Sequence, residues 1–317
     1  TASAVGAREI YGPHHPYGHR PEGTEDGLKS ATVADLRAAH ERAYTPATTA
    51  LVLAGDVTPD QARSLAEAAF GTWTAAPPGG AGSARTTAGA ATPAGGSAPA
   101  GGSAPPGPPA GHPDRLLLVD KPAASQTALF LAAPAVTRSD PDYEPMLVTN
   151  EVFGGSFSSR LNQNLREDKG YTYGVYSTID VLRGVGLLTI AMDVQTPSTA
   201  DAVRETIAEL DRLTASGVSA DELGRAKQAL SGSIPALFST RKKSLSALRT
   251  LYLDDLAPDY YQRRPGRLAG ITTATVADVA RRRFASEAFT LVAVGDRSAV
   301  EGPLRALNLG PVSPTAP

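Results

Sequence analysis

The chain has 317 residues, enough for about two domains, and its 41% hydrophobic and 20% charged residues are ordinary for a globular protein. Its formal net charge of −2 gives no electrostatic case for binding nucleic acid or an anionic membrane, and the absence of Cys excludes disulfides and thiolate metal sites. No apolar run approaches the ~18 residues of a membrane span, and the N-terminus lacks the features of a signal peptide. For the compartment we favour the bacterial periplasm or cell envelope, with the cytoplasm as the alternative that the composition also allows.

The first part of the chain is predicted to be a loop followed by helix, strand and helix. Residues 1–27 are polar and rich in Gly, Pro and His, which favours loop. A T-x-x-D start predicts a helix over residues 32–43, and apolar periodicity predicts another over 59–70. Between them, the apolar run 49–54 predicts a short strand that ends at Gly55-Asp56.

Residues 75–113 differ in composition from the rest of the chain. They are almost wholly Ala, Gly, Pro, Ser and Thr, with GGSAPA followed directly by GGSAPP. Such a segment cannot bury enough surface to offset the entropy of ordering it, so we predict a disordered linker. A flexible chain of this length has a mean span on the order of 30–35 Å, which would join two domains without fixing their angle.

The remainder of the chain is predicted to alternate between strands and amphipathic helices. Strands are expected at 115–119, 127–132, 185–192 and 289–294. Helices are expected at 141–153, 199–213, from the capping box of Ser219 and Glu222 to about residue 251, and at 260–268 and 275–284.

The end of the chain repeats its beginning. The sequence T-V-A-D stands at 32–35 and 275–278, and each copy is followed by a similar strand, ALVLAGD or TLVAVGD, and a helix. A chance match is the alternative, but the self-similarity favours two copies of one domain. The second copy is complete, whereas the first has only its tail, residues 31–70. Half a domain cannot bury its own core, so its front is expected to come from elsewhere.

Residues 154–176, GGSFSSRLNQNLREDKGYTYGVY, predict a tight turn, a short helix, a break and a strand. The two glycines permit unusual backbone angles, and Ser156 or Ser158 can cap the helix. Leu161 and Leu165 are four residues apart and share a helix face, and Gly170 ends the helix. The strand alternation then places Tyr171, Tyr173 and Val175 on one face and Thr172 and Tyr176 on the other.

Arg166 and Tyr173 are the candidate binding residues of this stretch. A fixed cation near a helix end is followed by a phenol on the next strand. Both groups donate hydrogen bonds, and both suit a peptide carbonyl or a developing oxyanion. Taken by spacing alone, the pair is better explained as a surface Arg and a half-buried Tyr without a shared role.

The whole stretch resembles the second half of the insulinase/pitrilysin family, zinc peptidases with an inverted H-x-x-E-H motif. There a G-G-x-x-S-R-L turn runs into L-R-E-x-x-G-x-x-Y or a close variant. The residues that match in order are Gly154, Gly155, Ser159, Arg160, Leu161, Leu165, Arg166, Glu167, Gly170 and Tyr173.

The resemblance extends over nearly the whole chain apart from the linker. Residues 16–27 resemble a P-Y-G…G-T segment late in the first half, Lys121-Pro122 with Gln126 resembles the opening of the second half, and 221–227 resembles its D-E-L-x-x-A-K helix. The implied fold is α+β, two similar sandwich halves of a clamshell, each a sheet packed by helices, with the first half incomplete. The domains would be 1–74, the linker 75–113, and the complete second domain 114–312.

In this family the zinc motif lies early in the first half, where two His and a more distant Glu bind Zn²⁺ and the motif's own Glu activates water. The five His of this chain are at 14, 15, 19, 40 and 112, and none begins H-x-x-E-H. The three early His lie in a Gly/Pro loop without a carboxylate at helical spacing, which favours a solvated or packed loop over a metal site. No metal ligand is therefore assigned in this chain, and the motif is expected upstream of Thr1.

The resemblance implies that the chain is the substrate-binding half of a zinc metalloendopeptidase, and is expected to be inactive alone. Arg166 and Tyr173 would hold and polarise the bound peptide near its scissile carbonyl, and Gln126 would help to position it. The zinc site would lie in the missing N-terminal part or on a family partner subunit. The alternative is a non-catalytic member of the family that acts as a peptide-binding or structural subunit. The charge and motifs give no support to nucleic-acid binding.

Overall fold

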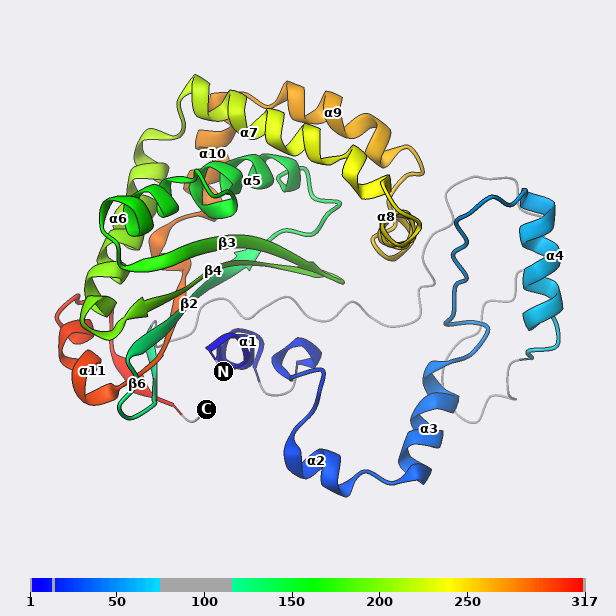
Figure 1. Ribbon diagram of the computed structural model, residues 1–317, viewed down its shortest axis with the longest axis horizontal. Coiled ribbons are helices and arrows are strands. Elements are labelled where there is room, and N and C mark those ends of the chain that lie inside the picture. Colours follow the sequence, from blue (N-terminus) through cyan, green and yellow to red (C-terminus); the bar gives the residue numbers. More distant parts are fainter. Residues whose placement is uncertain (1, 13–14, 75–115, 316–317) are drawn as a thin grey trace. The chain divides into compact units, whose positions relative to one another are not determined.

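A six-stranded mixed sheet lies at the centre of the computed structural model, which describes residues 2–12, 15–74 and 116–315 (Figure 1). The strand order is β3-β4-β2-β5-β1-β6. β2 pairs antiparallel with β4 and β5, β3 antiparallel with β4, and β1 parallel with β5 and β6. The strands are β1 (Leu116–Asp120), β2 (Gln126–Ala135), β3 (Thr172–Leu182), β4 (Val185–Gln195), β5 (Thr290–Gly295) and β6 (Val312–Pro314). The predicted strands after the linker are confirmed, and β6 was not foreseen.

One face of the sheet is covered by helices that follow the strands in the chain (Figure 1). Phe153 and Phe284 are fully buried there, with ring centroids 5.9 Å apart in an edge-to-face arrangement. Leu188, Ile190 and Leu210 are also fully buried, because the apolar stripe of the helices meets the apolar face of the sheet. The helices of this region are α5 (Tyr143–Asn150), α6 (Thr199–Ser216), α7 (Ala220–Ser233), α9 (Tyr260–Gly270), α10 (Thr273–Arg283) and α11 (Arg297–Arg305). The predicted fold, a sheet packed by helices, is confirmed.

The opposite face of the sheet is partly covered by α1 (Ala2–Tyr11), which contacts β2 and β5. Val5, Ile10 and Tyr11 form an apolar cluster there with side chains of the sheet, including Phe130 and Val292. The prediction of loop over residues 1–27 was wrong, since this segment also contains a short 3-10 turn, Pro16–Gly18, and the start of α2 (Glu25–Ser30). The helix α1 is stabilised by a sheet that lies more than 100 residues away along the chain, so the local sequence did not predict it.

The early helices are confirmed as α3 (Val33–Ala43) and α4 (Pro59–Phe70). Each begins with a reciprocal capping box, in which Thr32 pairs with Asp35 and Thr58 with Gln61. The predicted strand at 49–54 was wrong: these residues form no strand, and Leu51 and Leu53 are 52% and 44% exposed. A strand needs a neighbour for its backbone N–H and C=O groups, and no described strand pairs with this segment.

The described residues divide into two compact units. Of the described residues, 2–12, 15–21, 116–231 and 263–315 make up the unit that contains the sheet, and 22–74 with 232–262 form the second unit. The second unit includes α8 (Arg241–Leu253), whose positively charged first residues are exposed, as expected of a solvated helix face. The predicted linker 75–113 lies outside the described residues. No helix in the described ranges is long and apolar enough to cross a membrane.

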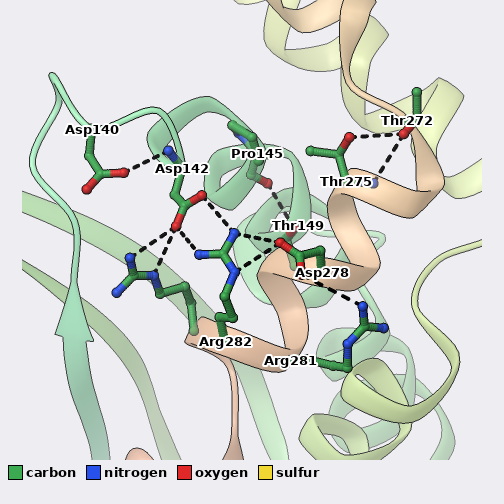
Figure 2. Close-up of polar contacts among 10 residues, drawn as sticks. Asp140, Asp142, Pro145, Thr149, Thr272, Thr275, Asp278, Arg281 and Arg282 are labelled. Atoms are coloured by element: carbon green, nitrogen blue, oxygen red, sulfur yellow. Dashed lines mark hydrogen bonds and ion pairs between the residues drawn. The ribbon is translucent and has the colours of Figure 1, made fainter.

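The N-terminus of α5 is attached to the C-terminal end of α10 by ion pairs (Figure 2). Arg282 Nη2 lies 2.9 Å from Asp142 Oδ1 and 2.7 Å from Asp278 Oδ2, and Arg283 Nη2 lies 3.0 Å from Asp142 Oδ2. Hydrogen bonds from Arg282 are the main cause that lowers the pKa of Asp142. Pro145 falls in the first turn of α5, where its missing N–H leaves no intrahelical bond unmade. The position of α5 sets that of the glycine turn that follows it.

Candidate functional site

The two glycines of the turn are required by close packing. Gly154 and Gly155 end the π-helical turn η2 (Glu151–Gly155), and neither has a positive φ. A Cβ on Gly154 would lie 2.6 Å from Ser177 Cβ, and one on Gly155 would lie 3.0 Å from the backbone oxygen of Asn150. The expectation that these glycines serve unusual backbone angles was therefore wrong, since Gly154 lets η2 approach β3 and Gly155 lets the chain pass close to Asn150.

The turn itself is closed by backbone and hydroxyl hydrogen bonds. Ser159 N donates to Ser156 O at 3.1 Å, and Ser156 Oγ donates to Glu151 O at 3.1 Å. The serine at the start of the next helix is Ser159, whose hydroxyl accepts from Asn162 Nδ2 at 3.3 Å and, at 3.5 Å, from Asn162 N. The predicted caps, Ser156 and Ser158, were wrong, because Ser156 binds the preceding helical turn and Ser158 is exposed.

Two asparagines that sequence reasoning missed attach these helical turns to β3. Asn162 Oδ1 accepts from Val175 N at 3.1 Å, and its Nδ2 donates to Val175 O at 2.8 Å. Asn150 Nδ2 donates to Ser177 O at 2.8 Å, and its Oδ1 accepts from Ser177 Oγ at 2.5 Å. A side-chain amide carries a donor and an acceptor side by side, so it can form the backbone hydrogen bonds that a neighbouring strand would otherwise form. Asn162 stands directly after Leu161 and three residues before Leu165. This position beside the two apolar residues was the only sequence signal that Asn162 would be buried.

The family-motif residue Arg160 has a structural contact. Its Nε and Nη2 bind Glu222 Oε1 and Oε2 at 2.7 and 2.8 Å, and Nη2 also donates to Gly217 O at 2.9 Å. Hydrogen bonding from Arg160 is the main cause that lowers the pKa of Glu222 to about 2. Glu222 also completes the predicted capping box, since Ser219 N donates to its Oε2 at 2.8 Å. Arg160 therefore fixes the helix start to α7.

Arg166 lies on the π-helical segment η3 (Asn162–Asp168); Leu165 on this segment and Leu161 just before it, the predicted pair, are both fully buried. Its Cζ lies 4.0 Å from the centroid of the Phe157 ring, and its side chain is 30% exposed. Nη1 is 3.2 Å from Glu167 Oε1, yet it is buried and forms no hydrogen bond. We take this contact as an ion pair without a hydrogen bond, because the two atoms are close enough but the N–H group is poorly aligned with the carboxylate oxygen. The guanidinium is therefore held mainly at one face.

Gly170 ends this segment as predicted. Its φ is +65°, and Tyr171 N donates back to Leu165 O at 2.9 Å. The chain then enters β3 through a bulge between Thr172 and Val175. Because of the bulge, Tyr173 is 95% exposed while Val175 is fully buried, so the prediction that the two share a face was wrong.

Gln126 and the start of β3 lie at the same end of the sheet. Gln126 is the first residue of β2, not the residue before it, and pairs with Gln195 of β4. Val194 of β4 pairs with Thr127 on one side and Thr172 on the other. Gln126 and Tyr173 therefore lie on strands about 10 Å apart, with β4 between them. No hydrogen bond or ion pair within the described residues joins Arg166, Tyr173 and Gln126 to one another.

A separate polar pocket of about 610 Å³ is lined in part by η3, and neither Arg166 nor Tyr173 is among its lining residues. Glu151, Asn164 and Glu222 contribute to its walls. Burial raises the pKa of Glu151, and the Oδ1 atom of Asn164 is buried without a hydrogen bond while its Nδ2 donates to Glu209 at 2.7 Å. This pocket was not predicted from the sequence.

The described residues do not fit a metal site. No group of three or more His, Cys, Asp or Glu side chains in that part of the chain is placed to hold a metal ion. Of the early histidines, His15 is buried, stacks on Tyr11 at 4.9 Å and accepts a hydrogen bond from Tyr17 N at 3.1 Å. This agrees with the packed-loop interpretation for His15. A zinc ion would need ligands that this arrangement does not provide.

Comparison with known proteins places these features in a family. A family profile described as "Peptidase M16 inactive domain" matches residues 30–230. The chain is 29% identical over 241 residues to the uncharacterised zinc protease YmxG of Bacillus subtilis, which covers 75% of this chain and 51% of that protein. It is 28% identical over 226 residues to the uncharacterised zinc protease Rv2782c of Mycobacterium tuberculosis, with 69% and 45% covered. The chain thus spans about half the length of the curated relatives it matches.

Solved structures share the fold. The crystal structure of a peptidase M16 inactive domain from Pseudomonas fluorescens aligns with a TM-score of 0.78 at 22% identity, over 93% of this chain and 65% of that one. A chain of Complex III2 from Candida albicans aligns with a TM-score of 0.73 at 12% identity, over 97% and 69%. As the resemblance to insulinase and pitrilysin indicated, the chain belongs to the peptidase M16 family and carries its inactive, C-terminal domain, without the zinc motif.

Proposed function

We propose that this chain is the substrate-binding half of a zinc metallopeptidase, which holds and polarises a peptide while the zinc ion is bound elsewhere. The observation that carries the proposal is the 95% exposure of Tyr173 at a strand start that the glycine turn and Asn162 hold in place. An exposed aromatic side chain on a rigid support is arranged for contact with a partner molecule. It also lies at the sheet end where Gln126 begins β2.

The donor groups of Arg166, Tyr173 and Gln126 suit the carbonyl oxygens of a peptide. A guanidinium, a phenol and an amide can each donate a hydrogen bond to a carbonyl and polarise it. As hydrogen-bond donors, the three groups can orient a substrate and stabilise charge but cannot generate a nucleophile. A second component must therefore supply the nucleophile.

We infer that this component is a zinc ion held upstream of residue 1 or on a family partner subunit. Its activated water would supply the nucleophile when the metal is bound. The names of the relatives, zinc proteases of which this chain covers only about half, support the inference. The chain by itself is then expected to bind peptide and to hydrolyse none.

The alternative is a non-catalytic member that binds peptide or has a structural function. It is favoured by the state of Arg166, which already contacts Phe157 and Glu167 and is joined to Tyr173 by no hydrogen bond or ion pair within the described ranges. A structural subunit would have no need of a free donor at this place. The two functions therefore differ in whether the donors affect turnover.

The test uses the chain together with the zinc-bearing half, supplied as the upstream part of the same protein or as a co-purified subunit. Hydrolysis of fluorescein-labelled casein is measured for the unaltered protein and for the double variant Arg166→Ala, Tyr173→Phe. Removing such donors is expected to lower turnover about 10²-fold, by analogy with oxyanion donors, with zinc content unchanged.

The matched control is Arg37→Ala, Tyr44→Phe, which changes an exposed Arg and an exposed Tyr outside the sheet-containing unit. It is expected to leave turnover unchanged. Full activity of the Arg166 and Tyr173 double variant would refute the assignment. Casein binding without hydrolysis, in the presence of a zinc-loaded partner half, would favour the non-catalytic alternative.

A further inference from the structure

Phe157 is an apolar side chain in an unusual place. It lies in the turn between η2 and the helix that carries Arg166, and it is 63% exposed. Burial of an aromatic ring stabilises a fold, so a ring left in water at a rigid position contributes little to stability. The turn that carries it is rigid, because Ser156 O accepts from Ser159 N at 3.1 Å and from Asn162 Nδ2 at 3.1 Å.

The ring lies against the guanidinium of Arg166. The 4.0 Å between Arg166 Cζ and the ring centroid is well inside the ~6 Å range of a cation–π contact. A planar guanidinium stacked on a ring loses its freedom to tilt. Phe157 therefore fixes the plane in which the N–H groups of Arg166 lie.

The other contact of Arg166 is less able to fix this plane. Glu167 is the next residue along the helix, and side chains at adjacent helical positions do not face each other. Its carboxylate is 50% exposed and forms no aligned hydrogen bond with Nη1. Arg166 Nε and Nη2 have no hydrogen-bond partner among the described residues, so these donors remain available to a ligand.

We propose that Phe157 is a positioning residue, which holds the Arg166 guanidinium flat so that its free edge meets a carbonyl of the bound peptide. The proposal rests on the proposed function, in which Arg166 binds peptide. Phe157 itself forms no bond with the reacting atoms. Its contribution is to pre-order a flexible side chain, which lowers the entropy lost on binding.

The first measurement tests the contact without any substrate. The 317-residue chain is labelled with ¹⁵N-arginine, and the side-chain NMR signals of Arg166 are assigned through Arg166→Lys. The Arg166 side-chain protons lie over the Phe157 ring, so their signals are expected at high field in the unaltered chain. This shift is expected to persist in Phe157→Tyr and Phe157→Trp, which keep an aromatic face, and to disappear in Phe157→Leu.

The second measurement is the affinity for fluorescein-labelled casein, followed by fluorescence anisotropy. Phe157→Leu is expected to weaken binding about two- to fivefold, the usual effect of an exposed cation–π contact, and Phe157→Tyr to restore it. In an Arg166→Ala background, Phe157→Leu is expected to have no further effect. Phe70→Leu, at another exposed Phe in the second unit, is the matched control and is expected to bind as the unaltered chain does.

The outcomes separate this proposal from the proposed function. If Phe157→Leu weakens binding equally with and without Arg166, or leaves the Arg166 signals at the same high field as in the unaltered chain, the positioning proposal is overturned while the function stands. If Arg166→Ala binds casein as tightly as the unaltered chain, the proposed function of Arg166 fails, and the positioning proposal fails with it. Circular dichroism of each variant at the assay temperature shows that the compared chains are folded.

Discussion

The side-chain amide of Asn162 lies against the backbone of Val175 and forms two hydrogen bonds with it, at 3.1 and 2.8 Å. This one pair connects the helical segment that carries Arg166 to the strand that begins beside Tyr173. Both residues are buried, so water cannot replace these bonds. The geometry of the candidate site therefore depends on an asparagine that has no chemical function in it.

Asn162→Ala is expected to destabilise the chain by about 2–4 kcal/mol, because it leaves a buried N–H and a buried C=O of Val175 without partners. Urea denaturation followed by circular dichroism measures the change in the free energy of unfolding. Gln163→Ala is the control, since its side chain is exposed and binds only exposed Asp168, at 3.0 Å. Equal stability of the two variants would show that the Asn162 amide contributes no more than a surface contact.

Gly154→Ala is expected to destabilise the chain by about 1–3 kcal/mol through overpacking. The new methyl group would lie 2.6 Å from Ser177 Cβ and 3.0 Å from Leu161 Cδ1, which forces η2 away from β3. Gly224→Ala in α7 is the control, because its Cβ meets nothing within 4 Å and Ala favours a helix. The melting temperatures of the two variants are therefore expected to move in opposite directions. A Gly154→Ala chain with an unchanged melting temperature contradicts the packing explanation.

Glu222 is expected to make stability depend on pH at acid values. Its folded-state pKa is lowered from 4.5 to about 2, chiefly by hydrogen bonds from Arg160. A depressed pKa stabilises the folded chain above the unfolded value, and this contribution is lost as the pH falls from about 4.5 towards 2. Glu222→Gln is therefore expected to lose less stability than the unaltered chain between these pH values.

The measurement is the difference in unfolding free energy between the unaltered chain and Glu222→Gln at several pH values, since other carboxylates also titrate in this range. Asp142, for example, also has a lowered pKa, because of Arg282 and Arg283. A difference between the two chains that stays constant from pH 5 to pH 2 would exclude Glu222 as the titrating group.

The ion pair between Glu144 and Arg264 is expected to be sensitive to the loss of one partner. Arg264 Nε lies 3.1 Å from both carboxylate oxygens, and the two side chains are only 12% and 10% exposed. Arg264→Met removes the closest cation from a buried carboxylate, which Arg267 still contacts at 3.3 Å, and should cost about 3 kcal/mol. The double variant Arg264→Met, Glu144→Leu should recover much of this loss, because no charge is then left buried.

Chemical denaturation of the single and double variants gives the coupling free energy of the pair. Arg305→Met, which removes one partner of an exposed pair with Glu301, is the control and is expected to change stability little. If the double variant is no more stable than Arg264→Met, the buried-charge explanation is wrong.

Much of the fold could be predicted from local patterns. The strands β1, β2, β4 and β5 and the helices α3, α4, α5 and α10 follow from apolar runs, capping boxes and periodicity. The family could be identified because the motif residues from Gly154 to Tyr173 keep their spacing along the chain. The sequence could not show that the cap is Ser159 and not Ser156 or Ser158, since all three serines satisfy the same local rule.

The sequence by itself determined the family, the position of the candidate donors Arg166, Tyr173 and Gln126, and the absence of an H-x-x-E-H motif. Only the tertiary structure decided how those donors are presented. The bulge that exposes Tyr173, the amide of Asn162 on Val175 and the ring of Phe157 under Arg166 all depend on contacts between separate elements. The apolar side chains of α1 and of the 49–54 segment show the same division. Residues 2–11 form a helix because a sheet covers their apolar side chains. Residues 49–54 form no strand because no described strand pairs with them. Periodicity specifies which residues can be buried, but the partner that buries them is fixed only when the chain is folded.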